Sequence, residues 1–276
     1  MISIVVNLDT RPGFLEQESK AEVMLNGARS VDFLTDGIVN KNKFFKDFEH
    51  ETIVYIDYHE PLPVDTMHTL NRMLERGEIT SITFNRHREY FNDMVYCPKF
   101  NDLNYLQAIA LARGEYIAHF DADVVGFLND KSLLEWWTQR LADYEYDFIS
   151  YPSAASPKAV DDPAFDYMWA STRFFMCRRD TFKYDETLKC LLDSNYLYGT
   201  YGDRARKCPW FEHVISLITG GNGVWYPPIE YDRCMIFSWN HYRTGTINKL
   251  NNTSYEEVKR FVLDRGGISY PNDISV

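Results

Sequence analysis

An α/β fold, in which helices cover the faces of a mostly parallel central sheet, is the architecture that the sequence predicts. Over the first 120 residues, short apolar runs alternate with segments of helical periodicity, and this order is typical of parallel strands joined by helical crossovers. The chain has 276 residues, of which 45% are hydrophobic and 25% charged, so it is long enough for a sizeable buried core. Polar stretches follow three of the expected strands, and ligands bind such sheets beyond the carboxyl ends of their strands.

The first half of the chain contains four expected strands with helices between them. Each strand is a short run rich in β-branched or aromatic residues, bounded by polar residues. The strands cover residues 2–6, 52–57, 79–84 and 115–120. The helices show an apolar face or a terminal glycine, and they cover residues 14–25, 64–77 and 101–114.

The second half is less regular and contains fewer recognisable elements. A helix over 133–144 would place four apolar side chains inward: Leu133, Leu134, Trp137 and Leu141. Residues 152–208 show little periodicity. The other expected elements are a strand over 146–151, a helix over 210–221, strand pieces within 223–237, and a helix over 254–267 that opens with an S-x-x-E capping box.

The overall charge and the cysteines exclude some classes of protein. The net charge of −11 argues against a nucleic-acid-binding protein, because such proteins usually carry a basic surface. The five cysteines are scattered and show no C-x-x-C pattern, so neither a zinc site nor a disulfide framework is indicated. No stretch approaches the ~20 apolar residues of a membrane span. We therefore expect a cytoplasmic protein without a transmembrane segment, and peripheral attachment to a membrane stays open.

The segment "GEYIAHFDADVVGF" is an apolar strand that ends in two aspartates, Asp121 and Asp123. Two carboxylates are expensive to bury without a partner, so water or a cation must meet them. Mg²⁺ and Mn²⁺ prefer oxygen ligands and are often held by one or two carboxylates together with substrate phosphates. The same spacing also occurs where aspartate merely caps a turn. The pair is therefore either a divalent-cation site or a capped turn.

The surroundings of this pair resemble a known family. The segment "AIALARGEYIAHFDAD" is similar to the central segment of GT-A glycosyltransferases, in particular their family-2-like group. The N-terminal "SIVVNLDTRPGFL" resembles that family's first strand and following turn, and "IVYID" resembles its second strand. The resemblance covers roughly residues 1–125. It implies a GT-A fold in which residues 1–125 bind the nucleotide sugar and residues 126–276 form the acceptor half, ending in a helix.

The resemblance also implies roles for individual residues. Asp121 would approach the ribose and the metal, and Asp123 would hold the metal, Mn²⁺ or Mg²⁺, against the diphosphate. One departure concerns the turn after the first strand, which reads Asn-Leu-Asp-Thr where the family usually has P-T-x-N. The positions that would contact the nucleotide sugar are Asp9, Thr10, Arg11, Asp57, Asp121, Ala122 and Asp123.

A base for the acceptor hydroxyl is expected at the start of a helix in the second half. The family-2-like group often has a Glu-Asp pair there, and this chain has Glu212 followed by His213 in "WFEHVISLI". Glu212 in the first turn would be kept ionised by the helix dipole, and His213 could titrate near neutral pH. The alternative is that Glu212 caps the helix and His213 packs at its edge. Asp203 in "YGDRARK" is the reserve candidate for the base.

Further candidates follow the third strand and the last strand pieces. Arg86 in "NRHREY" could contact the diphosphate, although a solvated loop explains it equally well. His241 in "FSWNHYRTG" is a candidate third metal ligand, because many GT-A enzymes complete the metal shell with a C-terminal histidine. Arg243 in the same segment could also reach the diphosphate.

Together these features predict a metal-dependent glycosyltransferase. It would move a sugar from a nucleotide-diphosphate donor to a glycan or other hydroxyl acceptor, and the family resemblance implies inversion at the anomeric carbon. A retaining GT-A enzyme and a sugar-phosphate nucleotidyltransferase are the alternatives, although the loop after the first strand lacks the glycines and lysine usual in the latter. A carbohydrate-binding module would explain the 16% aromatic residues but not the acidic pair. The absence of G-x-G-x-x-G after the first strand argues against a Rossmann-type oxidoreductase.

Overall fold

A computed structural model describes most of the chain. The described residues are 1–9, 31–57, 64–84, 98–121, 124–128, 130–150, 170–172, 174–205, 211–219, 223–225 and 234–238. The strands are β1 (Ile2–Asp9), β2 (His50–Asp57), β3 (Ser81–Phe84), β4 (Tyr116–Asp121), β5 (Val124–Leu128), β6 (Phe148–Ser150), β7 (Phe174–Arg178), β8 (Val224–Trp225) and β9 (Cys234–Ser238). The helices are α2 (Val31–Phe44), α3 (Val64–Glu75), α4 (Pro98–Ala110), α5 (Lys131–Ala142), α7 (Tyr184–Leu192), α8 (Ser194–Tyr201), the short 3₁₀ helix η3 (Gly202–Arg204) and α9 (Phe211–Ile218).

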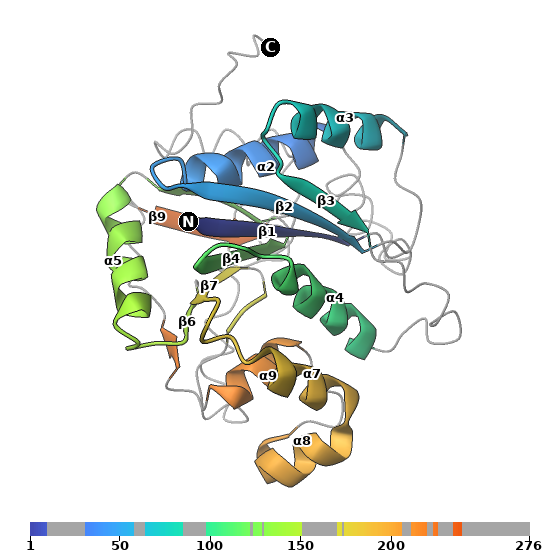
Figure 1. Ribbon diagram of the computed structural model, residues 1–276, viewed down its shortest axis with the longest axis vertical. Helices are drawn as coiled ribbons and strands as arrows, with labels where there is room; N and C mark the ends of the chain where they lie inside the picture. The colour runs from blue at the N-terminus through green and yellow to red at the C-terminus, as the bar shows by residue number, and fades with distance from the viewer. Residues whose placement is uncertain are drawn as a thin grey trace, which may run out of the picture.

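Seven of the described strands form one sheet in the order β3-β2-β1-β4-β7-β6-β8. Strands β1 to β4 are mutually parallel, and their arrows point the same way in Figure 1. Strand β7 runs antiparallel to both of its neighbours, β4 and β6, while β6 and β8 are parallel. Strands from both halves of the chain thus complete one mostly parallel sheet, as the sequence predicts. The two remaining strands, β5 and β9, pair antiparallel in a separate small sheet.

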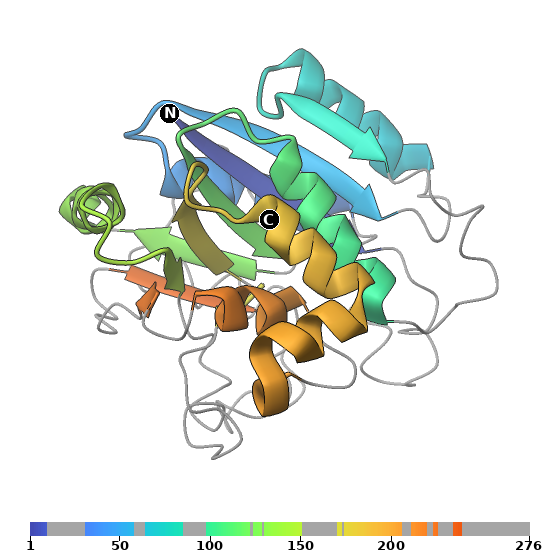
Figure 2. The same ribbon diagram turned by 60° about the horizontal axis from the view of Figure 1, so that its bottom comes forward.

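Helices cover both faces of the large sheet (Figures 1 and 2). Alternate residues of β1 point to opposite faces, as the pleat of a strand requires. Ile4 and Val6 pack in a core with α2, α3 and α5, whereas Val5 packs in a second core with α4, α7 and α9. The predicted α/β fold class is therefore confirmed. Among the helices of the described ranges, none is long and apolar enough to cross a membrane.

Most of the expected elements are present, with shifted ends. The four strands of the first half are β1 to β4, and the helices expected at 64–77 and 101–114 are α3 and α4. In α5 the four residues expected to point inward are all at most 3% exposed: Leu133, Leu134, Trp137 and Leu141. The helices expected over 14–25 and 254–267 lie outside the described residues.

Apart from the short 3₁₀ helix η3, five elements were not predicted: α2, β5, β7, α7 and α8. None of them shows a clear pattern in the sequence. Helix α2 contains a glycine and buries the polar side chains Asn40 and Lys41, so its inner face does not read as an apolar stripe. Strand β7 is only five residues long, and α7 and α8 are nine and eight residues long. Such short apolar runs cannot be assigned to helix or strand by periodicity alone. Several of them pack on elements distant in sequence: β7 pairs with β4, α7 packs on α4 and α9, and α2 packs on β5.

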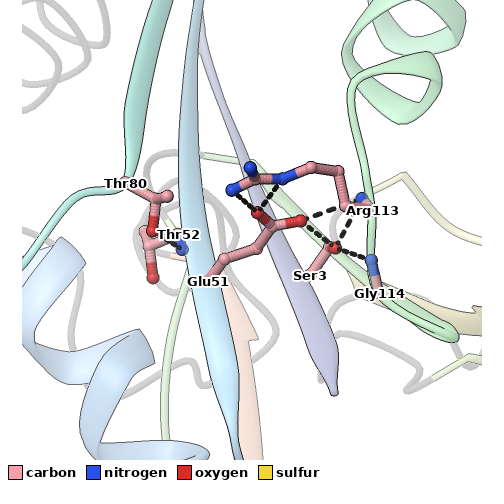
Figure 3. A network of polar contacts seen from close by, with 6 residues as sticks. All are labelled: Ser3, Glu51, Thr52, Thr80, Arg113 and Gly114. Atoms are coloured by element: carbon pink, nitrogen blue, oxygen red, sulfur yellow. Dashed lines mark hydrogen bonds and ion pairs between the residues drawn. The ribbon is translucent and has the colours of Figure 1, made fainter.

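A buried carboxylate joins the starts of β1 and β2 to the loop before β4 (Figure 3). Glu51 accepts hydrogen bonds from the hydroxyl of Ser3 and from the backbone N–H of Arg113, the latter at 2.9 Å. The Nε of Arg113 donates to the other carboxylate oxygen at 2.8 Å. The side chain of Glu51 is 5% exposed, while that of Arg113 is 67% exposed. A Cβ on Gly114 would lie 2.7 Å from the backbone N of Ser3, so this close approach requires glycine. The network fixes the edge of the sheet opposite the strand ends.

Replacing Glu51 by glutamine is expected to lower the free energy of unfolding at pH 7 by roughly 1–3 kcal/mol, because charged hydrogen bonds to a buried group are lost. Burial alone would raise the pKa of Glu51, but the hydrogen bonds from Ser3 and Arg113 and the charge of Arg113 outweigh burial and lower the pKa. A carboxyl group with a lowered folded-state pKa stabilises the fold above its unfolded pKa of about 4.3, and this contribution is lost as the pH falls through the folded pKa.

The melting temperatures of wild type and Glu51→Gln should therefore differ most near pH 7 and converge under acid conditions. Glu78→Gln is the matched control, because Glu78 forms an ion pair with Arg76 at the surface, where such pairs contribute about 0–1 kcal/mol. A difference in melting temperature that does not change between pH 7 and pH 3 would contradict the role assigned to the ionised Glu51.

Candidate active site

Three of the parallel strands end in aspartate at the same edge of the sheet. Asp9, the last residue of β1, is the register partner of Asp57, the last residue of β2. Asp121, the last residue of β4, is the register partner of Asn7 in β1. The pairing of distant strands therefore brings together three acids that lie up to 112 positions apart in the sequence. This edge is where a doubly wound sheet binds its ligands.

Asp121 is held by a tyrosine of the neighbouring helix α4. The hydroxyl of Tyr105 donates a hydrogen bond to Oδ1 of Asp121 at 3.2 Å, and the Asp121 side chain is partly exposed. Its register partner Asn7 is 9% exposed. Among the described residues, none donates a hydrogen bond to Oδ1 of Asn7. A buried amide oxygen without a donor is costly, so a ligand or a cation at this edge would satisfy it.

The ring of Tyr105 packs in a cluster of aromatic side chains. It stacks on Phe211 at a centroid distance of 5.5 Å and meets His119 edge-on at 5.1 Å. The ring of His119 in turn stacks on Phe175 at 5.0 Å. Burial lowers the pKa of His119 to about 3, with a smaller effect of the same sign from the charge of Lys41. His119 is therefore neutral at physiological pH and serves here as an aromatic packing residue.

Glu212, in the first turn of α9, is anchored to the segment before β7. Its Oε1 accepts hydrogen bonds from the backbone N–H of Thr172 at 2.6 Å and from the Thr172 hydroxyl at 2.7 Å. The hydroxyl of Ser171 donates to the same oxygen at 3.4 Å. One turn along α9, Ser216 accepts from the backbone N–H of Ala170 at 2.9 Å. These bonds anchor the start of α9 to the segment 170–172.

The register of β4 and β7 places Glu212 at the same edge as Asp121. Phe120 pairs with Phe174 across these antiparallel strands, so Thr172 lies two residues beyond the last pair, past the carboxyl end of β4. The bonds between Glu212 and Thr172 consequently hold the carboxylate near that end. The stacking of Phe211 on Tyr105, which donates to Asp121, connects the start of α9 to β4 a second time.

The other two candidates for the base are less well placed. His213 is 1% exposed, whereas Glu212 is partly exposed, so Glu212 is more accessible to an acceptor. Asp203 is exposed in η3, directly after α8. Helix α8 lies at the end of the molecule away from α2 and α3 in both views (Figures 1 and 2).

The donor atoms at this edge suit a hard divalent cation. Asp121 offers a carboxylate and Asn7 an amide oxygen, and Mg²⁺ and Mn²⁺ prefer such oxygen ligands. Within the described ranges, three or more His, Cys, Asp and Glu side chains do not gather into a metal cluster. Two of the three predicted ligands, Asp123 and His241, lie outside those ranges.

In the small sheet, β9 pairs with β5, the strand that follows the acidic pair in the sequence. Val124, the residue after Asp123, is the register partner of Ser238, the last residue of β9. His241 follows Ser238 by three residues in the sequence, and three residues span at most about 11 Å.

Several predicted site residues lie outside the described residues: Thr10, Arg11, Arg86, Ala122, Asp123, His241 and Arg243. For Asp9 and Asp57 the backbone is described and the side chain is not. The sequence interpretation did not assign a role to Asn7 or Tyr105. For Asn7 a signal was present, because a polar residue interrupts the apolar strand "SIVVNLD". For Tyr105 the sequence contains no comparable signal, since a tyrosine on a helix is usually a packing residue.

Comparison with known proteins finds glycosyltransferases among solved structures. No protein-family model matches the sequence, and no curated protein matches it. A galactosyltransferase LgtC structure with donor and acceptor sugar analogues is similar over 82% of this chain and 73% of that chain, with 11% identity and a TM-score of 0.49. Staphylococcus aureus TarS is similar over 96% of this chain and 43% of that chain, with 11% identity and a TM-score of 0.45. Mouse xyloside xylosyltransferase 1 is similar over 82% and 85%, with 9% identity and a TM-score of 0.43. At 9–11% identity and with TM-scores below 0.5, these likenesses carry no functional argument.

Proposed function

We propose that this protein is a metal-dependent glycosyltransferase that moves a sugar from a nucleotide-diphosphate donor to a glycan or other hydroxyl acceptor with inversion. The observation that carries the proposal is the convergence of Asp9, Asp57 and Asp121 at one edge of a parallel sheet, with Glu212 anchored at that edge. Such an edge offers acidic groups for a metal and a ribose at the ends of β1, β2 and β4, and a carboxylate base in the first turn of α9.

The donor would bind at the ends of β1, β2 and β4. In this proposal Asp9, Thr10 and Arg11 line the nucleotide pocket, and Asp57 accepts hydrogen bonds from the base or the ribose. Residues 1–125 form this donor half, and residues 126–276 form the acceptor half. Arg86 and Arg243 supply positive charge to the diphosphate, which a chain of net charge −11 must otherwise repel.

Asp121, Asp123 and His241 are the residues that would hold Mn²⁺ or Mg²⁺. The metal, when bound, supplies positive charge that stabilises the leaving diphosphate. The chain's own contribution is to orient the ligands: the hydroxyl of Tyr105 donates to Oδ1 of Asp121 at 3.2 Å and so fixes one oxygen of this carboxylate. The unsatisfied amide oxygen of Asn7, on the adjacent strand, supports a ligand position beside Asp121.

Glu212 is the base in this proposal. Its carboxylate accepts the proton of the acceptor hydroxyl while the acceptor oxygen forms a bond to the anomeric carbon. The bond from that carbon to the donor's phosphate oxygen breaks at the same time, and the electron pair leaves with the nucleoside diphosphate. Attack opposite the leaving group inverts the anomeric centre. The hydrogen bonds from Thr172 and Ser171 fix the orientation of the carboxylate that would act as the base.

A thermal-shift screen of nucleotide sugars with and without Mn²⁺ tests the proposal. A ligand that binds only the folded state raises the melting temperature, by an amount that grows with ligand concentration over Kd. We expect one nucleotide-diphosphate sugar to stabilise the protein only when Mn²⁺ is present. Stabilisation by a nucleoside triphosphate and a sugar phosphate instead would favour a nucleotidyltransferase. The absence of stabilisation by any nucleotide would overturn the proposed function.

A further inference from the structure

Helix α2 carries two polar side chains that are completely buried. Asn40 and Lys41 are each 1% exposed, and Lys41 is among the largest fully buried side chains of the described residues. Lysine is almost never fully buried, because its ammonium group loses its hydration. Both residues lie in α2 where it packs against β5. Helix α2 covers the face of the large sheet opposite the one that Tyr105 and α9 cover.

Asn40 bonds to the backbone of β5 as a neighbouring strand would. Its Nδ2 donates to the carbonyl of Gly126 at 2.9 Å, and the N–H of Gly126 donates to Oδ1 of Asn40 at 2.9 Å. One side chain therefore satisfies both backbone groups of one β5 residue. Loss of this side chain would leave two buried backbone groups unsatisfied.

Lys41 contacts the chain on both sides of the acidic pair. Its Nζ donates to the carbonyl of Val124, the residue after Asp123, at 2.7 Å. The same Nζ lies 5.6 Å from the ring centroid of Phe120, the residue before Asp121. A third contact, to the carbonyl of Gly37 at 3.3 Å, ties the ammonium to its own helix. The ammonium group of Lys41 thus contacts Phe120 before the acidic pair and Val124 after it.

We propose that Asn40 and Lys41 are positioning residues, which hold the segment 120–126 so that Asp121 and Asp123 meet the metal and the donor diphosphate. This inference rests on the proposed function and adds to it a layer of support on the opposite face of the sheet. The same bonds fix the strand on which β9 docks, because Val124 pairs with Ser238.

Lys41→Met tests the inference, because methionine keeps much of the side-chain volume but removes the charge and the donor. Asn40→Ala is the second variant, and it applies if Lys41→Met does not fold. Ile38→Ala is the matched control: Ile38 lies in the same helix and is 0% exposed, but it makes no side-chain hydrogen bond. Hydrogen exchange of residues 124–128 and calorimetric binding of UDP, GDP, ADP, CDP and dTDP in the presence of Mn²⁺ are measured for each protein.

We expect Lys41→Met and Asn40→Ala to raise exchange in β5 selectively, relative to β1, and to weaken Mn²⁺-dependent nucleotide binding about tenfold or more. Ile38→Ala should lower the melting temperature without either selective effect. If the Lys41 and Asn40 variants behave like Ile38→Ala while the wild type binds a nucleotide, the inference is wrong and the proposed function stands. If the wild type binds none of the five nucleotides with Mn²⁺, the proposed function fails and the positioning role falls with it.

Discussion

Replacement of Asp123 by alanine is expected to abolish Mn²⁺-dependent nucleotide binding while the fold is retained. In the proposed function this carboxylate would hold the metal, whose positive charge would attract the diphosphate to a chain of net charge −11. Asp123 follows the end of β4 by two residues, so its loss should not disturb the apolar core. Calorimetric titration with nucleotide in the presence and absence of Mn²⁺ measures the effect, and circular dichroism checks the fold.

Two further variants make this experiment more specific. Tyr105→Phe keeps the ring that stacks on Phe211 but removes the hydroxyl that donates to Asp121, so it should weaken metal-dependent binding about tenfold or less. Asp185→Ala removes an exposed aspartate in the first turn of α7 and should leave binding unchanged. Unchanged nucleotide affinity in Asp123→Ala would refute the metal assignment.

Glu212→Gln is expected to lower turnover by ~10²-fold or more without weakening donor binding, which is the usual scale for the loss of a general base. Glutamine retains a side-chain oxygen that can accept from the N–H of Thr172, so the anchoring of α9 is largely preserved. The amide cannot accept the proton of the acceptor hydroxyl. Steady-state kinetics with a saturating donor, together with calorimetric donor binding, separates the two quantities.

Two control variants each remove one hydrogen bond that anchors α9 but keep the carboxylate of Glu212. Thr172→Val deletes the hydroxyl that donates to Oε1, and Ser216→Ala deletes the hydroxyl that accepts from the N–H of Ala170. Both variants should retain most of the turnover if the carboxylate is the base. Turnover that falls as far in these variants as in Glu212→Gln would identify Glu212 as a structural anchor. Near-normal turnover in Glu212→Gln would return His213 and Asp203 as candidates.

The strands β1 to β4 and the helices α3 and α4 could be predicted from the sequence because their signals are local. β1, β2 and β4 are apolar runs that end in a polar residue, and such runs are long enough to indicate buried strands. The elements that could not be predicted depend on partners far along the chain. β7 is ordered by its antiparallel pairing with β4, more than fifty residues earlier, and α2 depends on side chains that bond to β5.

The same distinction applies to the candidate site. The acids at the strand ends could be identified from the sequence, because an aspartate that closes an apolar strand is conspicuous and parallel strands end at one edge. Tyr105 and Thr172 could not be identified, because their importance lies only in what they contact: a carboxylate on β4 and a carboxylate on α9. Spacing in the sequence contains no information on such contacts between elements.

The amino-acid sequence by itself determined the strands β1 to β4, the helices α3 and α4, and the acidic ends of β1, β2 and β4. It could do so because periodicity and strand ends are properties of neighbouring residues. Only the tertiary structure decided that β7 lies beside β4 in the sheet. It also decided that Glu212 bonds to Thr172 near the carboxyl end of β4, and that Asn40 and Lys41 bond to β5. The physical reason is that strand pairing and buried hydrogen bonds depend on residues that are distant in sequence, and on the cost of leaving buried polar groups unsatisfied.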